Sequence, residues 1–193
     1  MIYRNTFGRF LFGAQALALG SNNSKFIDGY GFSGQYHVTE EISIGAAMNK
    51  TLLSDNLIKS KQVIGLRGQP SYYATGIKYQ AKNLILNAVG IIQKNGDFTK
   101  GILPNSDQTT SSPTVVFDAK GLEVYSNYTF NKCGIKAEYN LYIPVTRDIH
   151  TDDIQTPINK DCIINDVIIG LSYQPIPFIK FYSEQRVSYG RSA

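Results

Sequence analysis

Three glycines have the spacing of a dinucleotide-binding fingerprint. Gly29, Gly31 and Gly34 follow the pattern G-x-G-x-x-G, in which glycines let the backbone approach a pyrophosphate at a helix N-terminus. That chemistry needs a strand before the motif and a helix after it. Here a polar segment precedes the motif and a strand-like alternation runs through it to Val38. We therefore expect no nucleotide cofactor, and we expect the glycines to fill strand positions that leave no room for bulk.

The two histidines offer little for catalysis or metal binding. His37 falls within the strand-like alternation, and His150 lies in a polar segment with Asp148, Asp152 and Asp153. A Ser-His-Asp site needs convergent side chains and a buried orienting acid, which nothing in the sequence indicates. The acidic segment could hold a divalent cation weakly, but a solvated loop is the simpler interpretation. We expect no enzymatic activity, no metal site and no cofactor.

Cys133 and Cys162 are the only cysteines, so the chain can form one disulfide at most. Neither has a second Cys or His at the spacing of a metal motif. The strand pattern places Cys133 in a short turn and Cys162 at the end of a long loop, about 20 Å or more apart at the opposite ends of strands. A disulfide requires Cα atoms within roughly 7 Å. We therefore expect no intramolecular disulfide.

Charged side chains recur at strand positions that alternate with apolar residues. These charges are the groups in this sequence that could act on passing ions. A Lys or Arg that faces lipid at the centre of a bilayer costs roughly 2–4 kcal/mol, so in a membrane barrel such residues should face the water-filled lumen. Their field would bias which ions pass. The residues are Lys78, Glu123, Lys136, Glu138, Asp166 and Lys180.

The elements that position these charges are predicted by a repeated period-two pattern, which is typical of strands with one apolar face. In residues 29–38, Tyr30, Phe32, Tyr36 and Val38 alternate with Gly31, Ser33, Gln35 and His37. The pattern recurs at 42–49, 122–130, 135–143 and 166–174, and less cleanly at 71–79. Three segments are ambiguous, at 10–19, 84–92 and 178–187. We expect about nine antiparallel strands of 9–11 residues and no helix.

The predicted connections alternate in length. Long ones cover residues 20–28, 50–69, 94–116 and 144–163, and short ones cover 39–41, 80–83, 131–133 and 174–177. In an antiparallel meander, alternate connections lie on opposite rims, so one rim carries every long loop. That asymmetry is typical of transmembrane β-barrels. A soluble β-sandwich also alternates, but its strands are usually about 5–6 residues long and it requires no such asymmetry.

The composition agrees with a barrel. Formal charge is only +4 and the basic residues are scattered, so we expect no nucleic-acid partner. No apolar run approaches the ~18 residues of a membrane-spanning helix. Aromatic residues before short turns predict a girdle at the lipid interface: Tyr36, Tyr79, Tyr128, Phe130 and Tyr173. The residues expected to face lipid are Tyr30, Phe32, Tyr36, Ile44, Tyr79, Ile135, Ala137, Tyr139, Val167, Ile169 and Tyr173.

The chain resembles the general diffusion porins of Gram-negative enteric bacteria. The matching residues are YRNT at 3–6, GYGFSGQY at 29–36, IGAA at 44–47, YATGIKY at 73–79, KNLIL at 82–86, YTF at 128–130 and DVIIG at 166–170. YATGIKY is the most specific of them, and their order holds across nearly the whole chain. The resemblance implies an all-β, up-and-down transmembrane barrel of 16 strands that assembles as a homotrimer. It also implies that Arg4 belongs to a basic pore wall.

The resemblance further implies that residues 1–193 form a single domain that is part of a longer porin. The chain would cover about strands seven to fifteen and lack the first strands, the acidic constriction loop and the last strand. The start of the chain lacks the pattern of a signal peptide, and Tyr189 is followed by GRSA instead of a terminal aromatic residue. The expected structure is therefore an incomplete wall of about nine strands, with open edges at residues 10–19 and 178–187.

The function that follows is passive diffusion of small hydrophilic solutes and ions through the bacterial outer membrane, with membrane lipid as the surrounding partner. Two alternatives stay open within the same fold: a receptor or adhesin that binds through its long external loops, and a non-functional truncated porin remnant. A soluble β-sandwich binding module is a more distant alternative.

Overall fold

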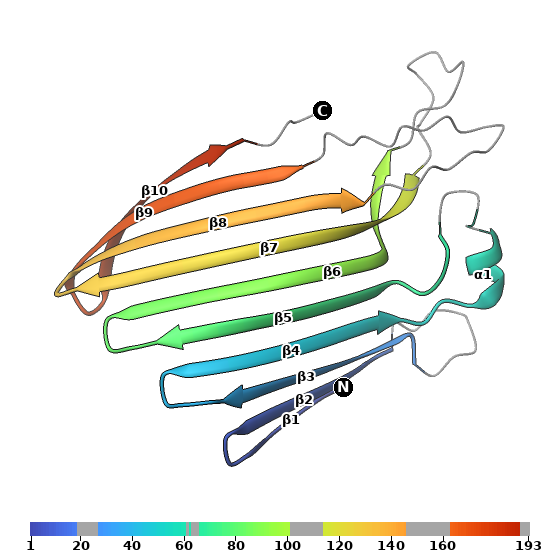
Figure 1. The fold of residues 1–193 in the computed structure, drawn as a ribbon, viewed down its shortest axis with the longest axis horizontal. Coiled ribbons are helices and arrows are strands. Elements are labelled where there is room, and N and C mark those ends of the chain that lie inside the picture. Colours follow the sequence, from blue (N-terminus) through green and yellow to red (C-terminus); the bar gives the residue numbers. More distant parts are fainter. Residues whose placement is uncertain (19–26, 61, 63–65, 101–113, 146–162, 190–193) are drawn as a thin grey trace.

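The computed structural model is all-β and describes residues 1–18, 27–60, 62, 66–100, 114–145 and 163–189. Its ten strands are β1 (Ile2–Phe7), β2 (Phe10–Leu17), β3 (Gly29–His37), β4 (Ile42–Thr51), β5 (Ser71–Gln80), β6 (Leu84–Lys100), β7 (Thr114–Phe130), β8 (Cys133–Val145), β9 (Ile164–Ile176) and β10 (Ile179–Ser188). They form one antiparallel sheet in the order of the chain, from β1 to β10. Figure 1 shows this sheet as an open, curved wall with β1 and β10 at its two edges. The expected up-and-down all-β fold is confirmed.

Four of the tight turns overlap the predicted ones, but the last was expected at residues 174–177, where β9 instead continues to Ile176, and the turn at residues 8–9 was not expected. Tight connections at residues 8–9, 38–41, 81–83, 131–132 and 177–178 share one rim, and the longer connections share the other (Figure 1). Two of the tight turns use left-handed backbone, at Gly8 (φ 58°) and at Asn131 (φ 51°). Glycine and asparagine are the residues that adopt this conformation at least cost. Because each of these two turns reverses the chain after two residues, it also fixes the register of the strands that it joins.

The strand count differs from the expectation of nine, because β1 was missed. Ile2–Phe7 lacks a clear alternation, and it becomes a strand through its pairing with β2, from Ile2 opposite Gln15 to Phe7 opposite Phe10. The edge at this side of the sheet is therefore β1, and residues 10–17 form an inner strand. With ten strands, the first and last strands both reach the rim of the long connections (Figure 1).

Two further expectations are corrected by local structure. β6 and β7 extend to 17 residues each, so the connection between them covers residues 101–113 and not 94–116. A short helix, α1 (Asp55–Ser60), lies in the connection between β4 and β5, where no helix was expected. Ser54 caps it, since its Oγ accepts a hydrogen bond from the backbone N–H of Leu57 at 3.2 Å. Within the described residues, no helix is long and apolar enough to cross a membrane.

The sheet has almost no hydrophobic core of its own. Among the described residues only Leu66 and Ala119 are buried hydrophobic side chains. Large apolar side chains along one face are exposed instead, including Phe32, Ile44, Ile77, Leu86, Ile92, Val124, Tyr128, Ile135, Ile169, Leu171 and Tyr173. We call this the apolar face. No second layer of the described chain covers it, so the described residues do not form a β-sandwich.

Candidate functional site: the polar face of the sheet

The opposite face of the sheet carries the polar side chains, and we call it the polar face. The register shows that it is continuous across eight strands. One row of paired residues runs from His37 through Ser43, Lys78, Asn87, Tyr125, Glu138 and Ile168 to Arg186. The neighbouring row contains Gln35, Gly45, Gly76, Val89, Glu123, Asn140, Asp166 and Ser188. Residues far apart in the sequence are therefore neighbours on one surface.

The side chains named from the sequence all map to this polar face. Lys78 and Glu123 line a hollow of about 420 Å³. Arg4 lines a second hollow of about 400 Å³, together with Gln15 and Tyr72, and Lys180 lines a third near the short turns. Lys136 and Glu138 on β8 and Asp166 on β9 complete the set. The residues expected to face lipid, such as Ile44 and Ile169, map to the apolar face by the same register.

Charged groups on β8, β9 and β10 form a network of ion pairs. Lys136 Nζ lies 3.3 Å from Glu138 Oε2 and 3.0 Å from Glu184 Oε1 on β10. Asn140 donates a hydrogen bond to Glu138 at 2.7 Å, and Arg186 forms an ion pair with Asp166. Lys136 also lies over the ring of Tyr125, at 5.8 Å from the ring centroid. Each charged group here therefore has a partner of opposite sign, although three carboxylates share two cations.

Gly170 allows this network to cross a whole strand. It lies on β9 between Lys136 and Glu184 in the register. A Cβ at this position would lie 3.2 Å from Glu184 Cγ and 3.5 Å from Lys136 Cβ. The absence of a side chain therefore leaves space for the ion pair between β8 and β10. Glu184 and Arg186 were missed as site residues, although the alternation of Lys180, Tyr182, Glu184 and Arg186 was a usable signal.

The fingerprint glycines prove to be packing positions within β3. A Cβ at Gly29 would lie 2.9 Å from the carbonyl oxygen of Lys50, and one at Gly31 would lie 2.8 Å from Nε2 of Gln15. The ring of Phe10 covers Gly34, at 3.2 Å from the position of a Cβ. No helix follows the motif, since β3 continues to His37. The glycines therefore serve the close approach of neighbouring strands.

The other residues considered for chemistry do not form a site in the described part of the chain. His37 Nδ1 lies 3.0 Å from Ser43 Oγ on the adjacent strand. The segment with His150 lies outside the described residues, as does Cys162, so their expectations stay predictions. Cys133 is exposed and begins β8 instead of lying within the turn. Among the described residues, no group of three His, Cys, Asp or Glu side chains could hold a metal ion.

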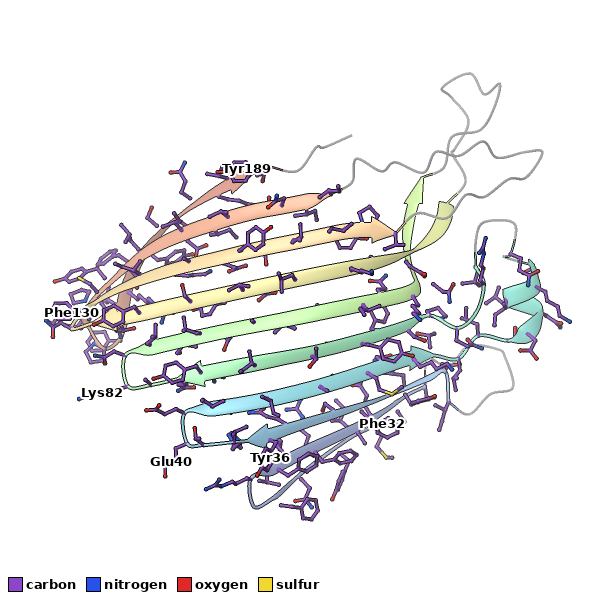
Figure 2. All side chains as sticks on the ribbon, viewed as in Figure 1. Phe32, Tyr36, Glu40, Lys82, Phe130 and Tyr189 are labelled. Atoms are coloured by element: carbon purple, nitrogen blue, oxygen red, sulfur yellow. The ribbon has the colours of Figure 1, made fainter. Side chains whose placement is uncertain are left out.

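Aromatic side chains gather near the rim of the short turns. Figure 2 shows Tyr36 and Phe130 close to that rim, which Glu40 and Lys82 mark at two of the turns. Tyr36 is paired with Phe10, and Tyr173 is paired with both Cys133 and Phe181. These rings lie on the apolar face and are exposed. The polar turns lie beyond these rings, and aliphatic residues lie towards the middle of the strands.

Comparison with known proteins gives a structural likeness only. No protein-family model and no curated protein matches the sequence. Among solved structures, Salmonella typhi OmpF, in its complex with daunomycin, matches 100% of this chain with a TM-score of 0.71 and 17% sequence identity. The Ralstonia pickettii toluene transporter TbuX matches 97% of this chain and 68% of its own with a TM-score of 0.49 and 16% identity. This chain spans 54% of the OmpF chain, about half its length. The fold is therefore that of ten consecutive strands in the wall of an OmpF-like β-barrel.

Proposed function

We propose that this chain forms part of the wall of a bacterial outer-membrane porin, a passive channel for small hydrophilic solutes and ions. One observation carries the proposal: one face of the ten-stranded sheet is apolar and exposed, and the opposite face carries the charged side chains named above. An exposed apolar surface of this extent needs a cover, and contiguous patches on soluble monomers are usually no larger than a few hundred Å². Lipid is the cover that suits a sheet with aromatic residues at its rim.

The polar face would then line the lumen. Water keeps its charged groups hydrated, and the seven candidate residues, Arg4, Lys78, Glu123, Lys136, Glu138, Asp166 and Lys180, bias the passage of ions by their field. No bond is made or broken, so the mechanism needs neither a catalytic group nor a cofactor. Selection rests on the width of the lumen and on the sign of the charges along its wall.

The likeness to OmpF supports the location in the outer membrane. The resemblance to porins adds two points to this proposal. The protein assembles as a homotrimer, and residues 1–193 belong to one barrel domain of a longer porin. Cross-linking of the native-length protein in isolated outer membranes tests both location and assembly. Trimers in that fraction are expected, and a monomer in the soluble fraction would contradict the proposal.

Conductance separates the channel from a receptor or adhesin with the same fold. We expect the native-length protein in planar bilayers to show discrete conductance steps, and Lys78→Glu to raise the preference for cations over anions. Lys82→Glu is the matched control, because Lys82 lies in a turn at the rim and is exposed. Absence of conductance in correctly folded protein would favour the receptor. Equal effects of the two substitutions would refute the role of wall charges.

A further inference from the structure

The hollow between β2 and β7 on the polar face has a floor without bulky side chains. It has a volume of about 420 Å³, and Gly45, Ala47, Ala74 and Gly76 line it. Side chains cannot easily be added to this floor, since a Cβ at Gly76 would lie 2.9 Å from the carbonyl oxygen of Ala88. The volume lies within the range of about 300–1,000 Å³ that is usual for small-molecule sites.

Two charged residues of opposite sign border this floor, and neither is paired. Lys78 and Glu123 both line the hollow, and neither has a hydrogen bond or an ion pair with any described residue. Their Cα atoms lie about 12 Å apart, since they are separated by two strand spacings and two residues along the strand. The charges of β8–β10 contrast with them, because each of those already has a partner of opposite sign.

An amide without a partner lies between the two charges. Asn87 is paired with Lys78 in the register, and Glu123 lies opposite the second residue beyond it, Val89. The Oδ1 atom of Asn87 is buried and accepts no hydrogen bond from the described chain. The atom lies beneath the surface, so a solute in the hollow does not reach it, whereas other atoms of Asn87 line the hollow between the two charges.

We infer that this hollow, which we call the Lys78–Glu123 hollow, is a binding site for zwitterionic solutes that carry a carboxylate and an ammonium group on a flat apolar body. The carboxylate lies at Lys78, the ammonium lies at Glu123, and the body rests on the glycine and alanine floor. A solute with a single charge satisfies only one side of the hollow. The inference rests on the proposed function, because solutes must reach the polar face through the lumen.

The test compares three ring compounds that differ only in charge: 4-(aminomethyl)benzoate, 4-methylbenzoate and 4-methylbenzylamine. Saturation-transfer NMR titrations on the native-length protein in detergent give their dissociation constants. We expect the zwitterion to bind up to about fivefold more tightly than either analogue, which is what one solvent-exposed ion pair contributes. Equal dissociation constants for the three compounds would overturn the inference.

Variants locate the binding. Lys78→Met and Glu123→Gln should each remove the advantage of the zwitterion, whereas Lys82→Met should leave it unchanged. The double exchange of Lys78→Glu with Glu123→Lys should restore it, because the zwitterion can bind in the reverse direction. Ala74→Leu places a larger side chain on the floor and should weaken the binding of all three compounds. An advantage that survives both single substitutions would place the binding elsewhere and refute the site.

Liposome swelling with the uncharged sugar arabinose separates this inference from the proposed function. Swelling together with equal binding of the three compounds would overturn the site and leave the channel intact. No swelling together with selective, Lys78-dependent binding would overturn the channel and support the site. Heat-modifiable gel mobility confirms that each variant is folded before its binding is compared.

Discussion

Two neighbouring isoleucines on β9 test which face meets lipid. Ile168 lies on the polar face, between Glu138 and Arg186, and Ile169 lies on the apolar face, between Ala137 and Gln185. The same substitution, Ile→Lys, can be made at both positions. The two variants have identical composition and charge, and their substitutions differ by one position in the sequence. Any difference in stability therefore reports the surroundings of the two faces.

The expected magnitude at Ile169 follows from its exposure. Ile169 is 54% exposed, and complete burial of such a side chain is worth roughly 1.5–3 kcal/mol, so contact of this surface with lipid contributes about 0.8–1.6 kcal/mol. A lysine near the bilayer centre adds a cost of roughly 2–4 kcal/mol. Ile169→Lys should therefore destabilise the protein in lipid by about 3–6 kcal/mol. Ile168→Lys should change stability by less than about 1 kcal/mol, because the lysine stays hydrated and its two neighbours, Glu138 and Arg186, carry opposite charges.

The assay is reversible urea unfolding of the native-length protein in lipid vesicles, followed by heat-modifiable gel mobility. A large loss for Ile169→Lys with little change for Ile168→Lys is the expected result. Equal losses would mean that both faces are equally hydrated, and a larger loss at Ile168 would mean that the orientation of the sheet is reversed. Either outcome refutes the assignment of the apolar face to lipid.

Three further outcomes are expected. Gly170→Leu should separate Lys136 from Glu184, which are 3.0 Å apart, and lower stability by about 0.2–1 kcal/mol for the lost pair; a double-mutant cycle with Glu184→Gln measures this, and full additivity would refute the crossing over β9. Mass spectrometry of non-reduced monomer should find no Cys133–Cys162 link, and finding one would contradict the strand order. Residues 1–193 expressed alone behind a signal peptide should aggregate or be degraded, because β1 and β10 leave backbone groups unpaired; stable, heat-modifiable protein with conductance steps would show that the sheet closes by itself.

Much of the fold is predictable because the period-two alternation is a local property. In β3, β4, β8 and β9 the polarity of most side chains indicates their face, so the strands, most of the turns and the two faces follow from the sequence. Lys78, Glu123 and Lys136 could be placed on the polar face for the same reason. The charged residues of β10 could have been included, since Glu184 and Arg186 continue the alternation that begins at Lys180.

The remaining features depend on contacts between strands. β1 has no clear alternation, and only its pairing with β2 makes it a strand. α1 depends on a cap by Ser54, which the alternation of the strands does not indicate. Which charges are paired was decided by register: Lys136 reaches Glu184, 48 residues away, because β9 pairs with both β8 and β10 and Gly170 leaves space between them. The sequence by itself determined which residues share a face, since strand geometry repeats every two residues. Only the tertiary structure decided which of them are neighbours, since this depends on the summed register of many turns.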